Sequence, residues 1–219
     1  MALNTIPNKG LTNQGYPSDR IVTPIIINGD MSVAQRGTSA TGKTSDGYYT
    51  VDRYQFAISS LGTWTFTQST DVPSGQGFGY SQKADCTTAD GSPSAGDRIF
   101  YRQSIEGQNL QLLKKGTSSA EKFTISFWVR SNKTGTYILE LYDHDNSRHI
   151  NKSYSISSAD TWEKKIIVID GDTTGAFTND ANLSLHVAWW LGAGSTYTSG
   201  SLQTSWGSAD NSNRAVGQV

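Results

Sequence analysis

The chain has 219 residues with 18 basic and 19 acidic side chains, so it lacks the excess positive charge with which proteins bind nucleic acid or acidic membranes. Serine and threonine supply 52 residues, glycine 22 and glutamate only four, a composition that disfavours helices and favours β-structure. The apolar runs are too short to cross a bilayer, and the single cysteine cannot form an internal disulfide. We therefore expect an all-β protein with no nucleic-acid partner and no membrane insertion.

The start of the chain is polar, is broken by glycine and proline, and predicts an extended arm over residues 1–25. Short strand-like runs then recur between turn clusters such as Asn28-Gly29-Asp30. In chain order, the predicted strands are 21–28, 31–35, 48–58, 62–68, 77–84, 98–105, 122–131, 136–143, 149–156, 161–170 and 182–190. One or two helical turns are expected between Ile105 and Leu113. About ten antiparallel strands at this spacing predict one jelly-roll type β-sandwich over residues 26–219.

Residues 37–44 match the phosphate-binding loop pattern, with Gly42, Lys43 and Thr44 at its end. That chemistry requires a helix directly after the loop, because the helix N-terminus supplies part of the field that holds the phosphates. The next residues, 45–51, are glycine-broken, aromatic and β-branched. We therefore predict a plain loop between strands, and an NTPase is disfavoured.

Two acidic turns, Asp143–Asn146 and Asp170–Gly175, resemble the beginning of calcium-binding loops. Position twelve of such a loop needs a bidentate glutamate, and the two turns have Tyr154 and Ala181 there instead. Plain turns are favoured, with a structural calcium ion as the alternative. No metal site and no cofactor are therefore predicted.

No catalytic residue can be named from the sequence. The three histidines, His144, His149 and His186, have no acidic partner at a recognisable catalytic or metal-ligand spacing. The four glutamates are scattered, so no acid–base pair for glycoside cleavage is indicated. We therefore expect a protein that is not an enzyme.

Alternation within the strands divides the aromatic residues between two faces. Phe123, Phe127 and Trp189 are assigned to the core. Trp190 has the opposite phase, and an outward indole offers a flat apolar face on which a sugar ring can stack. Trp190, His186, Tyr197 and Trp206 are therefore the candidate carbohydrate-binding residues. The alternative is that these side chains cover the second sheet or lie in a subunit contact.

Four segments of the chain form a series of motifs in a fixed order. The first is Asn28-Gly-Asp-Met-Ser-Val-Ala-Gln-Arg-Gly-Thr38, and the second is Tyr49-Thr-Val-Asp-Arg-Tyr54. The third is Ser126-Phe-Trp-Val-Arg-Ser131 with Gly135-Thr-Tyr137, and the fourth is Asp172-Thr-Thr-Gly175. In this order they resemble the motifs of a family of bacteriophage tail-fibre and minor virion structural proteins, in which the first is similar to the opening motif. The first residues, Ala2–Pro7, resemble the opening of fibre proteins from marine cyanobacterial phages.

The resemblance implies a jelly-roll domain similar to carbohydrate-binding modules, carried on the virion, assembled in the bacterial cytoplasm and commonly trimeric. Residues 1–25 would then attach to the particle or oligomerise, with Leu3, Ile6 and Pro7 as candidate contacts. Relatives continue with two further strands, so we expect that residues 26–219 lack the final strands or that a neighbouring subunit covers the open edge. The expected partners are other virion proteins, further copies of the chain and a host cell-surface polysaccharide.

Three functions follow from these observations. The first is a tail fibre or tail appendage that contacts host glycans without catalysis. The second is a capsid or tail decoration protein that contacts only other virion proteins. The third is an enzyme, either a glycan depolymerase or the NTPase suggested by the phosphate-loop pattern.

Overall fold

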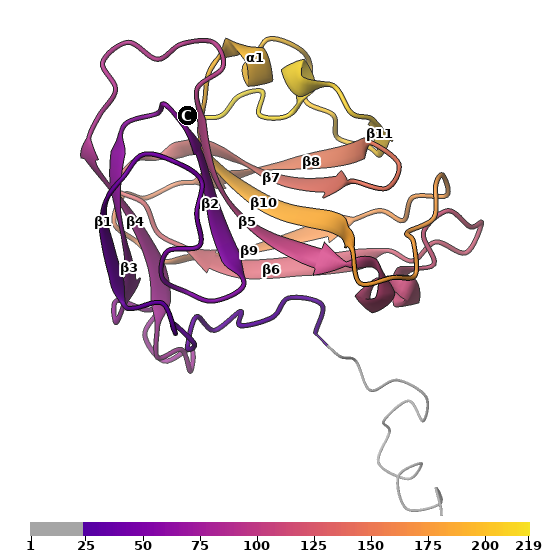
Figure 1. The fold of residues 1–219 in the computed structure, drawn as a ribbon, viewed down its shortest axis with the longest axis horizontal. Helices are drawn as coiled ribbons and strands as arrows, with labels where there is room; N and C mark the ends of the chain where they lie inside the picture. The colour runs from indigo at the N-terminus through magenta and orange to yellow at the C-terminus, as the bar shows by residue number, and fades with distance from the viewer. Residues whose placement is uncertain (1–23) are drawn as a thin grey trace, which may run out of the picture.

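The structure, a computed structural model, describes residues 24–219, which form a β-sandwich with a few very short helices (Figure 1). One layer is a six-stranded antiparallel sheet in the order β11-β8-β7-β10-β5-β2. Its strands are β2 (Tyr54–Ser59), β5 (Arg98–Glu106), β7 (Gly135–Asp143), β8 (Arg148–Ile156), β10 (Leu183–Ala193) and β11 (Gly207–Ser208).

The other layer consists of two smaller antiparallel sheets, β1-β3-β4 and β6-β9. Their strands are β1 (Ser39–Lys43), β3 (Thr63–Ser69), β4 (Ser81–Thr88), β6 (Phe123–Val129) and β9 (Glu163–Ile169). The short helices are η3 (Gly107–Asn109), η4 (Gln111–Leu113), α1 (Ser195–Thr198) and η5 (Asn211–Asn213). The all-β sandwich predicted from composition is confirmed, as are the helical turns expected after Ile105.

The central strands of the large sheet are covered on both faces. In β7, Leu139 and Leu141 point toward the smaller sheets, while Ile138 and Glu140 point the opposite way, and all four are buried. We term the side facing the smaller sheets the inner face and the other side the outer face. A strand enclosed on both sides requires a second covering element, which the two smaller sheets alone cannot supply.

The main core lies between the inner face and the β6-β9 pair. It contains Leu139, Leu141, Ile150, Leu185, Val187, Ile167 and Ile169 among its buried members. Phe123, Phe127 and Trp189 pack against this cluster, as their strand phase predicts. At the other end of the sandwich, the ring centroids of Phe56 on β2 and Phe66 on β3 lie 3.6 Å apart and join the three-stranded sheet to the large one. Within residues 24–219, no helix is long and apolar enough to span a membrane.

The N-terminal third differs from the prediction. The phosphate-loop pattern was expected to form a loop, yet residues 39–43 of it are strand β1, and no helix lies between β1 and β2. β1 runs antiparallel to β3, with Ala40 opposite Phe66. Pairing with a neighbour that carries a buried phenylalanine outweighs the low strand propensity of glycine and serine. The arrangement also lacks the helix N-terminus that phosphate binding needs.

The strand predicted over 31–35 is absent, and the described part of 21–28 is also irregular. Here side chains replace the partner strand, because Asn28 accepts from the Val33 amide and donates to the Val33 and Asp52 carbonyls. Asn28 has a positive φ of 56°, which asparagine tolerates better than most residues. The strands predicted from Tyr48 and from Gly77 begin later, at Tyr54 and Ser81.

Two segments that carry the family resemblance contact one another. Arg36 of the opening motif forms a 2.9 Å ion pair with Asp52 of the following element, and the Asp52 amide donates to the Val33 carbonyl. Arg53 forms an ion pair with Glu106 at 3.0 Å, next to the stacked rings of Tyr54 and Tyr101. The motif residues therefore hold the N-terminal loop against the sheet.

After β10 the chain folds back across the outer face, where it appears in yellow in Figure 1. We term residues 194–219 the C-terminal segment. Tyr197 and Ala215 are buried in it, and the Ala215 amide donates to the Tyr197 carbonyl over 2.8 Å. Near β7, the Val219 amide donates to Thr136 and the Ile138 amide donates to the Gln218 side chain. This segment is the covering element that the outer face requires.

Candidate functional site

The outer face of the large sheet brings charged and aromatic side chains together from three neighbouring strands. Every second residue of each strand reaches this face, and the register sets Trp190 opposite Phe100 and His186 opposite Tyr142. The residues are Arg98, Phe100 and Arg102 from β5, His186, Ala188 and Trp190 from β10, and Ile138, Glu140 and Tyr142 from β7. The C-terminal segment divides the face into a covered and an open part.

The covered part contains Trp190, whose exposed fraction is 0%. Its ring centroid lies 4.7 Å from that of Phe100 and 5.3 Å from that of Tyr197 in the C-terminal segment. The sequence correctly predicts that Trp190 faces away from Trp189, but the expectation that its ring is open to a sugar is wrong. The C-terminal segment covers the indole, so Trp190 and Tyr197 form a second small core.

An ion pair marks the boundary between the two parts. Arg214 of the C-terminal segment donates to both carboxylate oxygens of Glu140, at 2.7 and 2.9 Å, and Trp190 Nε1 donates to the same carboxylate at 3.0 Å. Burial alone raises the pKa of Glu140, but Arg214 and His149 outweigh it and lower that pKa to about 2. Glu140 is therefore an ionised anchor for Arg214, with no proton to donate at neutral pH.

The open part is built around Arg102, His144 and His186. Arg102 Nε donates to the Gln55 amide oxygen at 2.8 Å, and Arg102 Nη1 lies 3.5 Å from His186 Nδ1. His144 Nε2 is 2.7 Å from the same Nδ1. Tyr142 borders the group, with its ring centroid 4.7 Å from that of His144. Tyr142 lies near the end of β7 and is half-buried, and His144 lies in the turn after β7 and is exposed to solvent.

Both imidazoles of the open part are shifted toward the neutral form. Burial, Arg102 and His144 lower the pKa of His186 to about 3. Burial, Arg102 and Arg214 also lower the pKa of His144 below its usual value. The pKa of Arg102 is lowered by burial as well, although Asp46 acts in the opposite direction. At neutral pH the open part therefore has charged arginine beside two neutral imidazoles.

The fourth candidate, Trp206, does not join this face. Its ring packs against the main core, and its Nε1 donates to the Asp170 carbonyl at 2.8 Å. Of the four sequence-predicted residues, the structure thus gathers His186, Trp190 and Tyr197 on the outer face, and all three are buried. The side chains next to His186 reach the surface, because His144 is exposed and Tyr142 is half-buried.

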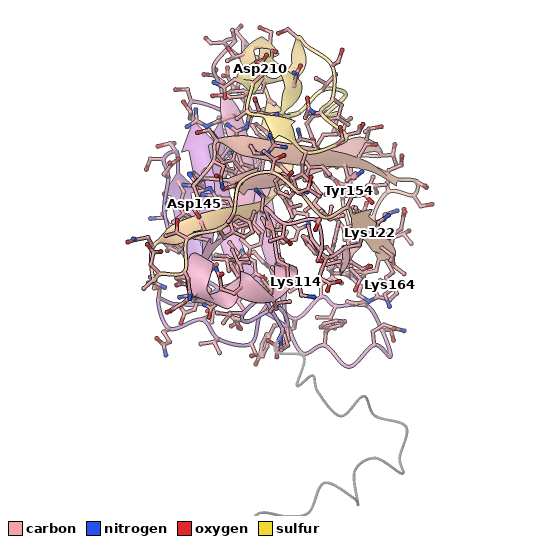
Figure 2. The ribbon with its side chains drawn as sticks, turned by 90° about the vertical axis from the view of Figure 1, so that its right-hand side faces the viewer. Lys114, Lys122, Asp145, Tyr154, Lys164 and Asp210 are labelled. Atoms are coloured by element: carbon pink, nitrogen blue, oxygen red, sulfur yellow. The ribbon has the colours of Figure 1, made fainter. Side chains whose placement is uncertain are left out.

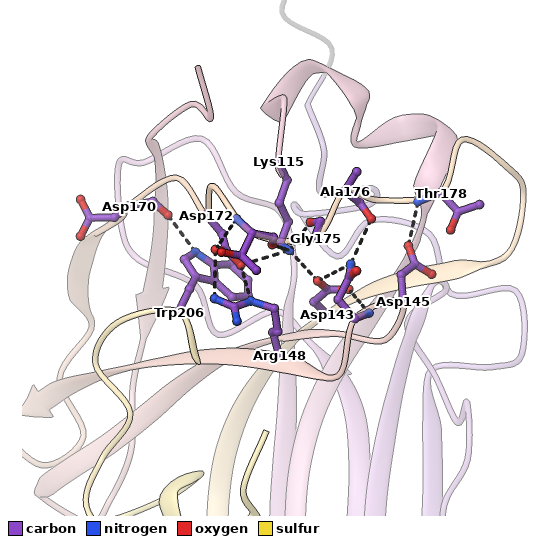
Figure 3. A network of polar contacts seen from close by, with 12 residues as sticks. Lys115, Asp143, Asp145, Arg148, Asp170, Asp172, Gly175, Ala176, Thr178 and Trp206 are labelled. Atoms are coloured by element: carbon purple, nitrogen blue, oxygen red, sulfur yellow. Dashed lines mark hydrogen bonds and ion pairs between the residues drawn. The ribbon is translucent and has the colours of Figure 1, made fainter. Parts of the chain in front are cut away.

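Trp206 instead borders a buried ionic network centred on Lys115 (Figure 3). Lys115 Nζ lies 2.6 Å from Asp143 Oδ2 and 3.1 Å from Asp172 Oδ2, and it donates to the carbonyls of Thr174 and Gly175 at 2.9 and 2.7 Å. Arg148 adds a bidentate contact to Asp172. The Lys115 side chain is only 4% exposed. Burial raises the pKa of Asp172, yet these donors lower it overall.

The network shows what the two calcium-like turns do. The first turn supplies Asp143, and the second supplies Asp172 and the two carbonyl oxygens, all directed at one ammonium group. The cation that these oxygens bind is therefore Lys115 Nζ. Among residues 24–219, no group of three or more His, Cys, Asp or Glu side chains is arranged to hold a metal ion.

A recess of about 320 Å³ lies beside this network, between η4 and the loop before Phe177. Lys114 and Lys115 both line it, together with Leu110 and Gln111. Figure 2 looks onto this end of the sandwich, with Lys114 and Asp145 labelled. Lys114 is already paired with Glu121 at 2.7 Å, and Lys115 belongs to the buried network. Both lysines that line the recess are therefore already paired with carboxylates.

The remaining candidates, Leu3, Ile6 and Pro7, lie outside the described residues. Sequence reasoning missed Arg102, Glu140 and Arg214. Arg102 could have been found from the alternation Arg98-x-Phe100-x-Arg102, which predicts two arginines on one side of a strand. Nothing in the sequence indicates that Arg214 meets Glu140, because the two residues are 74 positions apart and one lies in an irregular segment.

Comparisons with known proteins give one distant likeness. No protein-family model matches the chain, and no curated protein matches it. Among solved structures, it is similar to the enzymatically active domain of tailspike protein 4 from bacteriophage CBA120, with a TM-score of 0.40 and 16% sequence identity. The match covers 63% of this chain and 17% of that one.

This likeness corrects one expectation. The similar structure is described as an enzymatically active domain, which contradicts the prediction that the present protein is not an enzyme. That prediction is withdrawn.

Proposed function

We propose that this protein is a component of a bacteriophage tail and that its β-sandwich contacts carbohydrate on the host surface. The observation that carries the proposal is the open part of the outer face, where Arg102, Tyr142, His144 and His186 lie side by side. Proteins hold sugars with polar donors next to an aromatic ring. The donors bind the sugar hydroxyls, and the aromatic ring packs against the apolar face of the sugar.

The tail assignment is supported by the sequence motifs around Asn28 and Asp52, which resemble tail-fibre and minor virion proteins. In the structure these two motifs contact each other through Arg36 and Asp52. The two motifs are thus neighbours in the folded protein as well as in the sequence.

A glycan array tests the carbohydrate part. We expect the full chain to bind a subset of bacterial surface glycans and Tyr142→Ala to weaken that binding about tenfold, as loss of one ring contact can. Tyr80→Ala is the matched control, because Tyr80 is an exposed tyrosine directly before β4, a strand of the other layer. Absence of binding to any glycan, or equal losses in both variants, would contradict the proposal. Immunogold labelling of intact phage should mark the tail.

A second candidate is a subunit that contacts other virion proteins. It is favoured by Ile166 and Val168 on β9, which are 65% and 54% exposed and lie on the side of β9 away from the core. In that case Ile166→Asp should reduce incorporation into phage particles while leaving the fold and any glycan binding intact. Incorporation at the wild-type level would exclude this surface as the contact.

A further inference from the structure

The outer face has more positive charge than its own carboxylates neutralise. The charge of Arg214 is neutralised by its bidentate pair with Glu140. Arg98 donates to the Tyr197 hydroxyl at 3.0 Å and lies over the same ring. Arg102 donates to a neutral amide and has no carboxylate at ion-pair distance among the described residues. Asp46 acts on it only through longer-range electrostatics. One half-buried guanidinium therefore has donors left for an acidic ligand.

The arginine beside the histidine pair favours one arrangement of its protons. Arginine can only donate, so Arg102 Nη1, 3.5 Å away, favours the His186 tautomer in which Nδ1 is the acceptor. In that tautomer His144 Nε2, 2.7 Å from the same nitrogen, is the donor of the contact between the two imidazoles. When His144 is neutral, its Nδ1 is a lone-pair acceptor at the surface. When His144 is protonated, Nδ1 also donates, and the contact with His186 is unchanged.

We propose that the open part of the outer face binds the carboxylate groups of an acidic polysaccharide. The Arg102 guanidinium donates to the carboxylate, and His144 supplies a second donor. The planar guanidinium matches a planar carboxylate better than any other side chain does. This inference rests on the proposed function, because it specifies which carbohydrates the same surface takes.

Binding should be linked to proton uptake at His144. The charged and titratable groups around this imidazole come from several elements: Arg102 from β5, His186 from β10, Arg214 from the C-terminal segment, Tyr142 and Asp143 from the end of β7, and Asp145 from the turn after it. Burial and the two arginines favour its neutral form. A bound carboxylate adds negative charge at this point and favours the protonated form. Affinity should therefore rise as the pH falls below the usual imidazole range.

Titration of the full chain with alginate oligosaccharides tests the inference, with neutral dextran oligosaccharides and dextran sulfate as the other probes. We expect alginate binding, at least about tenfold weaker in Arg102→Gln, and dextran binding weaker than alginate binding. Lys83→Gln is the control: it removes one positive charge from an exposed site on β4 and should change affinity less than about twofold. Wild-type affinity should rise severalfold from about pH 7.5 to about pH 5, and His144→Gln should abolish that rise.

Equal losses in Arg102→Gln and Lys83→Gln would overturn the inference, because they would indicate attraction to any polyanion. Stronger binding of dextran sulfate that also depends on Arg102 would overturn the assignment to carboxylates. Binding of neutral glycans with no effect of Arg102→Gln would refute this inference and leave the proposed function standing. Failure to bind any glycan would refute both. Urea denaturation of each variant separates lost binding from lost folding.

Discussion

Two groups of charged side chains in this molecule differ in how fully their hydrogen-bonding capacity is used. Lys115 has three N–H groups and four oxygen atoms within 3.1 Å, all enclosed between the loops at one end of the sandwich. Arg102 has five N–H groups, of which one binds an amide and another reaches an imidazole at 3.5 Å. The complete network can only hold the fold together, whereas the incomplete one can accept a ligand.

The largest expected effect is on the Lys115 network. Lys115→Met should lower the free energy of unfolding by about 3–5 kcal/mol, because it leaves Asp143 and Asp172 buried with less compensating charge. Lys114→Met, which removes the neighbouring half-exposed lysine, should cost less than about 1 kcal/mol. Urea denaturation of both variants measures the difference. Similar values for the two would mean that the network around Lys115 is not what stabilises the loops.

The covered part of the outer face should give an intermediate effect. Trp190→Phe keeps an aromatic ring but removes the donor to Glu140, and leaving a buried carboxylate without that bond should cost about 1–3 kcal/mol. Trp206→Phe removes an indole hydrogen bond to a partly exposed carbonyl and should cost under about 1 kcal/mol. Calorimetry measures the loss of stability in each of the two variants. The opposite order would show that the C-terminal segment is not held by Glu140 and its donors.

A pH dependence of the stability separates two groups on the outer face. The pKa of His186 falls from its ordinary 6.5 to about 3, so the unfolded chain binds a proton that the folded chain does not. Stability should therefore decline as pH falls from 6.5 to about 3. The pKa of Glu140 falls from 4.5 to about 2, so its contribution is present above 4.5 and is lost as pH falls through about 2.

His186→Gln should flatten the upper part of this decline and keep the lower part. Urea midpoints between pH 7 and pH 3 would measure both, and His144→Gln, at the more exposed imidazole, should remove a smaller share of the upper part. An unchanged profile in His186→Gln would mean that this histidine is as easily protonated in the folded protein as in the unfolded chain.

The alternation of apolar residues in β6, β7 and β10 is a local property, which is why the sequence predicts these strands and the face that each aromatic occupies. The covering of Trp190 is not local. It depends on residues 194–219, which have almost no regular structure and therefore no periodic signal. The same holds for Lys115, whose four oxygen partners come from two turns, with Thr174 lying 59 positions away. Each turn can be predicted from the sequence, but the contact of both turns with Lys115 cannot.

The bond between Glu140 and Arg214 has a consequence for how the protein is made. A ribosome must add 74 residues after Glu140 before Arg214 exists, so this carboxylate is made long before the partner that it is buried with. The outer face is thus completed only after the strands beneath it have been synthesised, and contacts this distant in sequence form late and slowly. Until the C-terminal segment packs against it, the outer face exposes a carboxylate and the ring of Trp190, which is the kind of surface on which chaperones and neighbouring chains act.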